Sequence, residues 1–449
     1  MQSDSEKAVS GARTALLLLL AINLFNYIDR SILAALLPTI KQQFLAGDPY
    51  QNTKAGFLTT AFLVSYMCMA PLFGWLADRY SRWMLVGIGV AVWSLASGWS
   101  GVAATFLILL WTRVFVGIGE AAYGPAAPTI ISDLYPLRTR GRMLALFYVA
   151  LPVGSALGYA FGGKIGDILG WRWAFYLVMP PGLLLAACCF FMRDPHPPTT
   201  RSGVTRKATF REYRELFHNR SYILNTAAMT VMTFAIGGFA AWMPDYIFLD
   251  RARELQGNQA TLGNIGLTFG AITAVAGLVA TLLGGWAGDK LRARFASSYF
   301  LISGAGMILC VPAILAVIYV RFPAAWIMIF IAEFFLFFNT GPSNAALANV
   351  TPRTVRASAF ALNIFIIHAL GDAISPPLIG AVRDRWNMDV ALFGVSILML
   401  VAGLLWFWGA KFLAADTAAV EAAAAGLGEA ESEPNGRSPS NDRSHHVRN

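Results

Sequence analysis

Charge is scarce in this chain: Asp, Glu, Lys and Arg make up only 13% of its 449 residues, whereas 57% are hydrophobic. Because a soluble domain carries about 25% charged residues, this balance excludes an ordinary soluble protein. Cysteine is also rare, and the four cysteines form no Cys-x-x-Cys pair that would indicate redox chemistry or a metal site. We expect a membrane protein whose cysteines serve as small apolar side chains.

Motifs for ATP use and for hydrolysis are missing as well. The chain has no Gly-x-x-x-x-Gly-Lys-Ser/Thr phosphate loop, no His-Glu-x-x-His pair and no serine nucleophile elbow. We therefore expect a protein that is not an enzyme, that uses no cofactor or metal ion, and that draws on an energy source other than ATP.

Long apolar runs recur along the whole chain. A helix of about 20 apolar residues crosses the hydrocarbon core of a bilayer, which is roughly 30 Å thick. We predict an all-α membrane protein with twelve transmembrane helices in two six-helix bundles. The expected spans are 14–38, 55–78, 83–102, 104–127, 143–166, 171–192, 222–247, 262–286, 297–320, 323–346, 357–381 and 388–413.

Basic residues are distributed unevenly around these spans. If both chain ends lie on one side, that side carries 23 of the 34 Lys and Arg residues and the opposite side carries 9, with residues at span ends assigned to the nearer side. An excess of basic residues is typical of cytoplasmic loops, so we expect both termini in the cytoplasm and the protein in the cell inner (plasma) membrane. The net charge of +9 then reflects orientation, and we expect no nucleic-acid partner.

A break rich in proline and basic residues separates the spans into two halves. We predict that it contains a short amphipathic helix on the membrane surface, with partner binding as the alternative role. After the last span, small and polar residues predict a weakly helical start and then a disordered tail. The expected parts are a cytoplasmic segment 1–13, a bundle 14–192, the linker 193–221, a second bundle 222–413 and the cytoplasmic tail 414–449.

The two halves repeat one motif, in which a glycine is followed four residues later by an aspartate and a basic residue. Its two aspartates, Asp78 and Asp289, are 211 residues apart, close to half the chain. Glycine lets two helices approach closely, and a carboxylate at a helix end can accept hydrogen bonds from the first N–H groups of a neighbouring helix. We expect a cytoplasmic gate made of Gly74, Asp78, Arg79, Arg82, Gly285, Asp289 and Lys290.

Four charged residues, Asp29, Arg30, Arg113 and Glu120, lie inside apolar spans. A charge at the bilayer centre costs roughly 2.5–3.5 kcal/mol, so such residues usually mark an ion or substrate path. Arg113 and Glu120 share a helix face, and the helical rise places Asp29 at the depth of Arg113. We expect Arg113 to pair with Asp29 or Glu120, either as a proton-coupled switch or as a permanent structural cluster. Arg30 points about 100° away from Asp29 and is expected to serve packing or gating.

The second half carries fewer intramembrane charges. Glu333 lies in a phenylalanine-rich span, so a charged wall facing an aromatic wall would suit an amphiphile, although phenylalanines more often face lipid or neighbouring helices. His368 and Asp372 share a helix face, either as a structural pair or as a second proton site. The aromatic wall would consist of Phe330, Phe334, Phe335, Phe337 and Phe338.

Three glycines recur at four-residue spacing in the fifth expected span. Gly154, Gly158 and Gly162 therefore share one helix face. A face without side chains allows close contact between helices, so we predict tight packing there.

The repeated aspartate motif resembles the cytoplasmic-loop motif of the major facilitator superfamily, although Ser81 stands where glycine is usual. The segments 26–30, 113–125 and 128–136 look like its spinster branch. This resemblance implies two bundles around a central cavity that opens alternately to either side. It also implies that Asp29, Arg113 and Glu120 couple protons to substrate and that Asp78 and Asp289 lie at the gate. Eukaryotic members of the branch are linked to the export of lysolipids and sphingolipid phosphates.

These features predict a proton-coupled secondary transporter, acting as a monomer among membrane lipids, for a small organic substrate that is amphiphilic or lysolipid-like. Three alternatives remain open. An uncoupled facilitator of the same fold would ignore a pH gradient, a multidrug exporter would accept unrelated compounds, and a substrate sensor would bind without translocation.

Overall fold

The computed structural model describes residues 11–77, 79–194, 216–255, 257–352 and 355–432. Twelve helical segments in this part of the chain are long and apolar enough to cross a membrane, as predicted. The helices are α1 (Ala12–Phe44), α2 (Gln51–Ala77), α3 (Arg82–Gly101), α4 (Phe106–Tyr123), α5 (Ala126–Leu134), α6 (Leu137–Leu169), α7 (Trp171–Phe190), α9 (Arg220–Leu249), α10 (Leu262–Arg292), α11 (Ser298–Tyr319), α12 (Ala325–Phe338), α13 (Thr340–Asn349), α14 (Arg356–Ile367), α15 (Ser375–Arg385) and α16 (Met388–Ser432).

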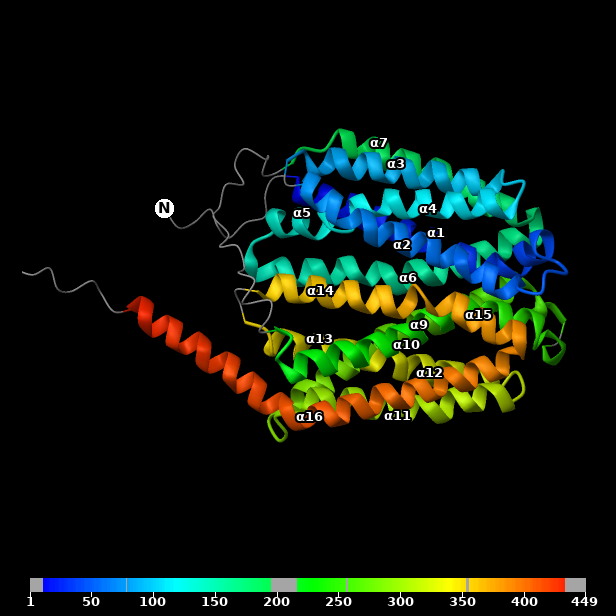
Figure 1. The fold of residues 1–449 in the computed structure, drawn as a ribbon. Helices are drawn as coiled ribbons and strands as arrows, with labels where there is room; N and C mark the ends of the chain where they lie inside the picture. The colour runs from blue at the N-terminus through cyan, green and yellow to red at the C-terminus, as the bar shows by residue number, and fades with distance from the viewer. Residues whose placement is uncertain (1–10, 78, 195–215, 256, 353–354, 433–449) are drawn as a thin grey trace, which may run out of the picture.

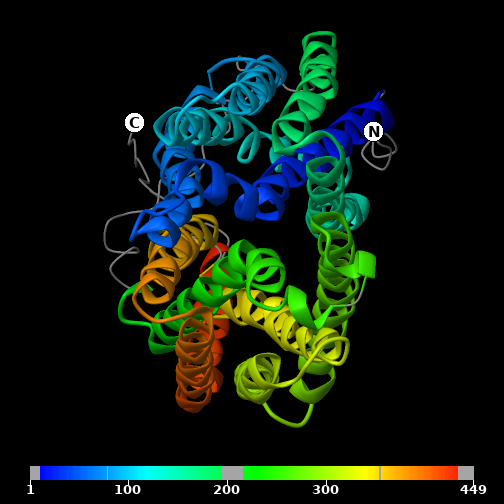
Figure 2. The same cartoon turned by 90° about the vertical axis from the view of Figure 1, so that its right-hand side faces the viewer.

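The helices form two bundles, α1 to α7 and α9 to α16, that lie one against the other (Figure 1). Three spans consist of two helices in succession, α4 with α5, α12 with α13, and α14 with α15. On one flank α6 lies beside α10, and on the other α2 lies beside α15 (Figure 2). These two seams join the halves and frame the space between them.

The helical start expected after the last span is present in the structure. Helix α16 continues to Ser432, well past residue 413, because the Ala- and Glu-rich stretch after the last span consists of strong helix formers. The expected amphipathic linker helix falls mostly on 195–215, outside the described residues.

The glycine face of α6 packs closely on α1, as predicted. A methyl group added to Gly158 would lie 2.5 Å from the carbonyl oxygen of Ile28, and one added to Gly154 would lie 2.7 Å from that of Leu24. The opposite face of α6 receives glycines of α10, where a methyl group on Gly270 would lie 2.6 Å from the Ala156 carbonyl oxygen. Helix α6 is therefore in backbone contact with both halves.

The halves meet closely at the end of the molecule away from the chain termini, at the right in Figure 1. There Gly56 packs on the backbone of Pro376 and Pro377, and Gly380 packs on that of Asn52. At the opposite end, Trp75 and Trp286 are 51% and 59% exposed.

The motif glycines lie at that opposite end. A methyl group added to Gly74 or Gly285 would meet no atom within 4 Å. Gly285 nevertheless packs closely within its own half, because a methyl group added to Gly341 of α13 would lie 3.0 Å from the Gly285 Cα atom.

Candidate functional site

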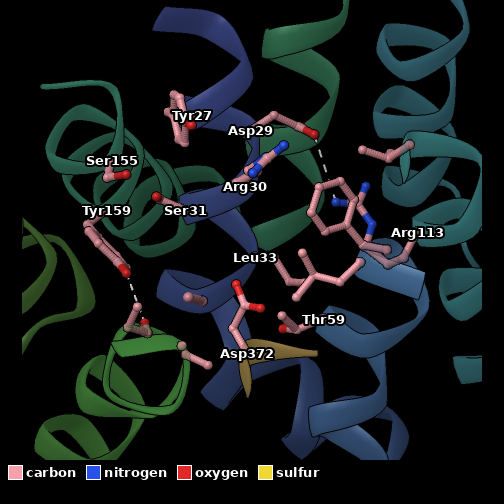
Figure 3. A pocket seen from close by; sticks show the side chains of 17 residues that line it. Tyr27, Asp29, Arg30, Ser31, Leu33, Thr59, Arg113, Ser155, Tyr159 and Asp372 are labelled. Carbon is pink, nitrogen blue, oxygen red and sulfur yellow. Dashed lines mark hydrogen bonds and ion pairs between the residues drawn. The ribbon is translucent and has the colours of Figure 1, made fainter. Parts of the chain in front are cut away.

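A cavity of 210 Å³ lies between the two halves (Figure 3). Asp29 and Arg30 of α1 and Arg113 of α4 line it from the first half, and Gly237 of α9 and Asp372 line it from the second. Three of the four charged residues singled out in the first half thus share one chamber with a carboxylate of the second half.

Asp29 and Arg113 lie together in this chamber, and both are almost completely buried. The Arg113 guanidinium approaches the Asp29 carboxylate to 3.9 Å, a long ion pair. Each partner is held by a serine of α3: Ser97 donates to Asp29, and Arg113 donates to Ser100 over 2.7 Å. These serines were missed from the sequence, although hydroxyls spaced three residues apart in an apolar span were a visible signal.

Glu120 pairs with Arg30, not with Arg113. The Arg30 Nη2 atom lies 2.5 Å from a Glu120 carboxylate oxygen, and Nε lies 2.8 Å from the same oxygen. The expectation that Arg113 is offered both acids, with Arg30 serving elsewhere, is therefore wrong. The offset of about 100° around the helix turns Arg30 away from Asp29. The same direction carries the long Arg30 side chain to Glu120 on α4.

An aromatic cage surrounds the Arg30 guanidinium. The rings of Tyr27, Phe62 and Tyr66 have centroids 5.2, 4.7 and 5.6 Å from its central carbon. Electron-rich ring faces attract a cation at these distances, so the cage stabilises Arg30 in addition to Glu120. The first half therefore holds two separate acid–arginine pairs.

The eleventh span breaks where it borders the cavity. A wide turn over His368–Asp372 separates α14 from α15. His368 Nδ1 lies 2.9 Å from an Asp372 carboxylate oxygen. Thr60 of α2 donates to the Ala373 carbonyl over 2.6 Å, which ties the turn to the first half.

Glu333 lies beside the main cavity and is 3% exposed. It lines a smaller space of 30 Å³ that shares Tyr159 and Ala240 with the larger one. Thr273 donates to one carboxylate oxygen over 3.0 Å, and the other oxygen has no hydrogen-bond partner among the described residues.

Only part of the expected aromatic wall lines a cavity. Phe337 lines the small space beside Glu333. Phe334 instead packs on Phe335 and Phe338, with ring centroids 5.4 and 5.5 Å apart. These rings pack on one another along α12 and do not form one continuous wall, because adjacent residues of a helix point in different directions.

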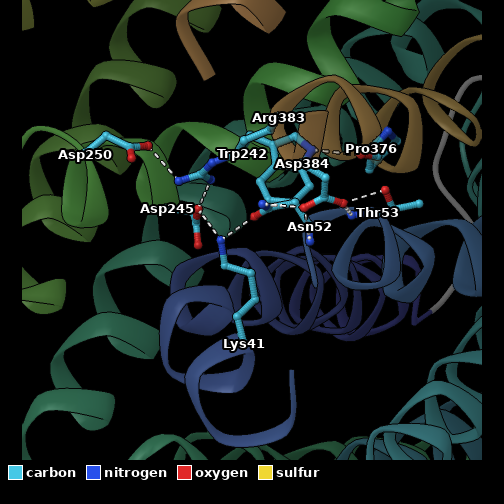
Figure 4. A network of polar contacts seen from close by, with 9 residues as sticks. All are labelled: Lys41, Asn52, Thr53, Trp242, Asp245, Asp250, Pro376, Arg383 and Asp384. Carbon is cyan, nitrogen blue, oxygen red and sulfur yellow. Dashed lines mark hydrogen bonds and ion pairs between the residues drawn. The ribbon is translucent and has the colours of Figure 1, made fainter. Parts of the chain in front are cut away.

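A buried ionic network joins the halves at their closed end (Figure 4). Lys41 of α1 contacts Asp245 of α9 over 2.8 Å, and the two side chains are 4% and 0% exposed. Arg383 of α15 also binds Asp245 and reaches Asp250 over 2.6 Å. Sequence reasoning missed this network because its members lie at span ends, where charges are ordinary.

The gate motif residues lie at the open end, which is the end where Trp75 and Trp286 are exposed. Arg82 is buried and bridges Asp133 and Asp194, each over 2.7 Å. Asp289 accepts a hydrogen bond from Tyr299 over 2.7 Å, within its own half. Asp78 falls outside the described residues.

The two basic residues that follow the motif aspartates both lie over tryptophans. Arg79 is 3.9 Å from the Trp75 ring centroid, and Lys290 is 4.6 Å from that of Trp286. The repeat is thus a repeat in structure as well as in sequence.

Comparison with known proteins gives a consistent result. Residues 19–376 match the family model of the Major Facilitator Superfamily. The chain is 38% identical to Protein spinster homolog 1 of Bos taurus over 391 residues, which cover 82% of this chain and 72% of that protein. It is 35% identical to Protein spinster of Drosophila melanogaster, of whose length it spans 60%.

Solved structures share the fold. A bacterial homolog of the human lysosomal transporter Spinster, crystallised in an inward-facing and unoccupied conformation, superimposes with a TM-score of 0.78 at 19% identity and covers 91% of this chain and 99% of that one. A D-xylose–proton symporter superimposes with a TM-score of 0.72 at 16% identity, covering 90% and 98%.

Proposed function

The chain belongs to the spinster-like branch of the Major Facilitator Superfamily, and on that premise we propose that it is a proton-coupled transporter of an amphiphilic substrate. It is a multi-pass membrane transporter with an alternating-access fold rather than an enzyme. Its energy source and its substrate class are what we propose.

Two acid–arginine pairs between α1 and α4 support proton coupling. Asp29 lines the cavity between the halves, Glu120 is buried within the first half, and each faces an arginine whose other contacts differ. Protonation of either acid removes the charge that its arginine faces. Because Arg113 is bound closely by Ser100 and only distantly by Asp29, it is the arginine best placed to meet an anionic group of the substrate.

The lining of the cavity supports an amphiphilic substrate. The lining combines the charged groups of Asp29, Arg30, Arg113 and Asp372 with apolar side chains, namely Leu33, Phe62, Leu63 and Val116. Small-molecule sites typically measure about 300–1,000 Å³, so a cavity of 210 Å³ suits the headgroup of a lysolipid-like molecule rather than the whole molecule.

The distribution of basic residues supports cytoplasmic termini in the inner membrane. With that orientation, the closed end that contains Lys41 and Asp245 faces the outside. The open end then faces the cytoplasm, and this structure corresponds to an inward-facing state of a monomeric carrier.

Transport in proteoliposomes tests the proposal. A fluorescent lysophospholipid and a drug-like cation are offered with and without an imposed pH gradient to the wild type, Asp29→Asn and Glu120→Gln. Asp48→Asn is the matched control, because this carboxylate lies in a loop and binds Lys54 and the Tyr50 N–H.

We expect the gradient to drive uptake in the wild type and the control, and both Asp29→Asn and Glu120→Gln to lose that dependence. Flux that ignores the gradient and the substitutions would identify an uncoupled facilitator with a structural charge cluster. Preference for the cation would identify a multidrug exporter, and binding without flux would identify a sensor.

A further inference from the structure

Asp384, at the end of α15, caps the start of α2 across the two halves (Figure 4). One of its oxygens accepts from the Asn52 backbone N–H over 3.0 Å, and the other accepts from that of Thr53 over 2.8 Å. The Asn52 amide and the Thr53 hydroxyl donate to the same two oxygens over 2.8 and 2.7 Å. One carboxylate thus satisfies two first-turn N–H groups that have no partner within their own helix.

Asp167, near the end of α6, makes the same contact with the start of α10. Its oxygens accept from the backbone N–H groups of Leu262 and Gly263 over 3.2 and 2.7 Å. Thr261 caps the next N–H, that of Asn264, from within the second half. The first N–H groups of α10 are therefore capped partly by Thr261 of the same half and partly by Asp167 of the other half.

The two caps are related by the internal repeat. Helices α2 and α10 are the second and eighth spans, while α6 and the α14–α15 pair are the fifth and eleventh. Asn52 and Leu262 are 210 residues apart, which agrees with the 211 residues between the motif aspartates. A carboxylate at the end of the fifth span caps the start of the eighth, and one at the end of the eleventh caps the start of the second. The same capping contact therefore occurs twice.

A helix start favours negative charge because its N–H groups and macrodipole are positive. At the closed end this attraction acts between the halves and adds to the ion pair of Lys41 with Asp245. If the halves separate there, both carboxylates and four N–H groups lose their partners. The caps therefore contribute directly to the stability of the closed end.

Helices α6 and α10 run in opposite directions. The end of α10 and the start of α6 therefore both lie at the other end of the molecule. Helix α10 ends beside Asp289, and α6 begins at Leu137 at that same end. In this structure Asp289 binds Tyr299 of its own half. A rocking motion that opened the closed end would bring the end of α10 toward the start of α6.

We infer that Asp167 and Asp384 are positioning residues for transport, which hold the two halves together at the closed end by capping α10 and α2. Opening that end during the transport cycle releases both caps. The inference rests on the alternating-access fold and is independent of proton coupling.

Electron–electron distance measurements on the full chain in lipid nanodiscs test it. With the four native cysteines replaced, spin labels at Tyr50→Cys and Trp386→Cys report on the closed end, and labels at Tyr80→Cys and Phe295→Cys report on the other. All four positions are at least 44% exposed. The variants are Asp167→Ala, Asp384→Ala and the more conservative Asp384→Asn.

We expect each alanine variant to lengthen the distance at the closed end and shorten the other, with about a fivefold change in the ratio of the two populations, the usual effect of losing one cap. Asp384→Asn keeps one acceptor and should shift less. A general loss of folding cannot produce shifts of opposite sign at the two ends.

Asp48→Asn is the matched control, since this carboxylate lies at the same end but binds within its own half. If Asp167→Ala and Asp384→Ala leave both distances equal to those of the control, the inference is overturned. The readout needs no pH gradient and no substrate, so its failure is distinguishable from failure of proton coupling.

Discussion

Replacing Gly158 by alanine should destabilise the protein, because the added methyl group would meet the backbone of Ile28 and the Cβ atom of Ser31, both on α1. It would lie 2.5 Å from the Ile28 carbonyl oxygen and 2.8 Å from Ser31 Cβ. Ordinary contact begins near 3.4 Å, so α6 must move about 0.9 Å away from α1. Neither obstacle is the flexible end of a side chain that could swing aside.

The size of the effect follows from two opposing terms. Alanine in place of glycine favours a helix by about 0.5–1 kcal/mol, whereas overpacking costs typically about 1–3 kcal/mol. The net loss is about 1–2 kcal/mol at Gly158. The same substitution at Gly74 meets open space in this structure and should retain only the favourable helix term.

Thermal unfolding in detergent, followed by tryptophan fluorescence, measures both variants under one protocol. We expect Gly158→Ala to unfold at a lower temperature than the wild type and Gly74→Ala at an equal or higher one. Equal midpoints for the two variants would refute the argument that α6 and α1 are in backbone contact.

Three other predictions follow from single contacts. Lys41→Met leaves the buried Asp245 with Arg383 alone, so unfolding in detergent should become easier by up to about 3–5 kcal/mol, and an unchanged midpoint would contradict burial of the pair. In a double-mutant cycle, Arg30→Met and Glu120→Gln should show a coupling energy of about 0.5–3 kcal/mol, and additive effects would contradict their contact. Outside the spans, hydrogen bonds from Arg251 lower the pKa of Glu254, so the stability that this pair provides is complete above the ordinary glutamate pKa and is lost as the pH falls. Glu254→Gln should therefore flatten the acid side of the stability profile measured by unfolding against pH.

Much of the fold could be predicted from the sequence. The twelve spans follow from apolar runs, because the bilayer sets the length of a helix that crosses it. The tight packing of α6 on α1 follows from three glycines on one face. Both features depend on local composition and on one periodicity, which the chain displays directly.

The pairing within the site could not be predicted, because it depends on how helices cross. A helical wheel gives the direction of Arg30 on its own helix but not the position of Glu120 on another. Lys41 and Asp245 are separated by 204 residues, and nothing near either residue indicates the other. Ser97 and Ser100 acquire their role only through the approach of α3 to Asp29 and Arg113.

Asp29 and Arg30 are consecutive residues of one rigid helix, and this adjacency is a kinematic constraint. Any rotation or shift of α1 displaces both side chains together, so the distance to Arg113 and the distance to Glu120 cannot change independently. If a proton or a substrate charge at one pair moves α1, the distance within the other pair changes as well, and the peptide backbone alone transmits this change. Arg113 and Glu120, two turns apart on α4, are therefore coupled through the rigid movement of α1.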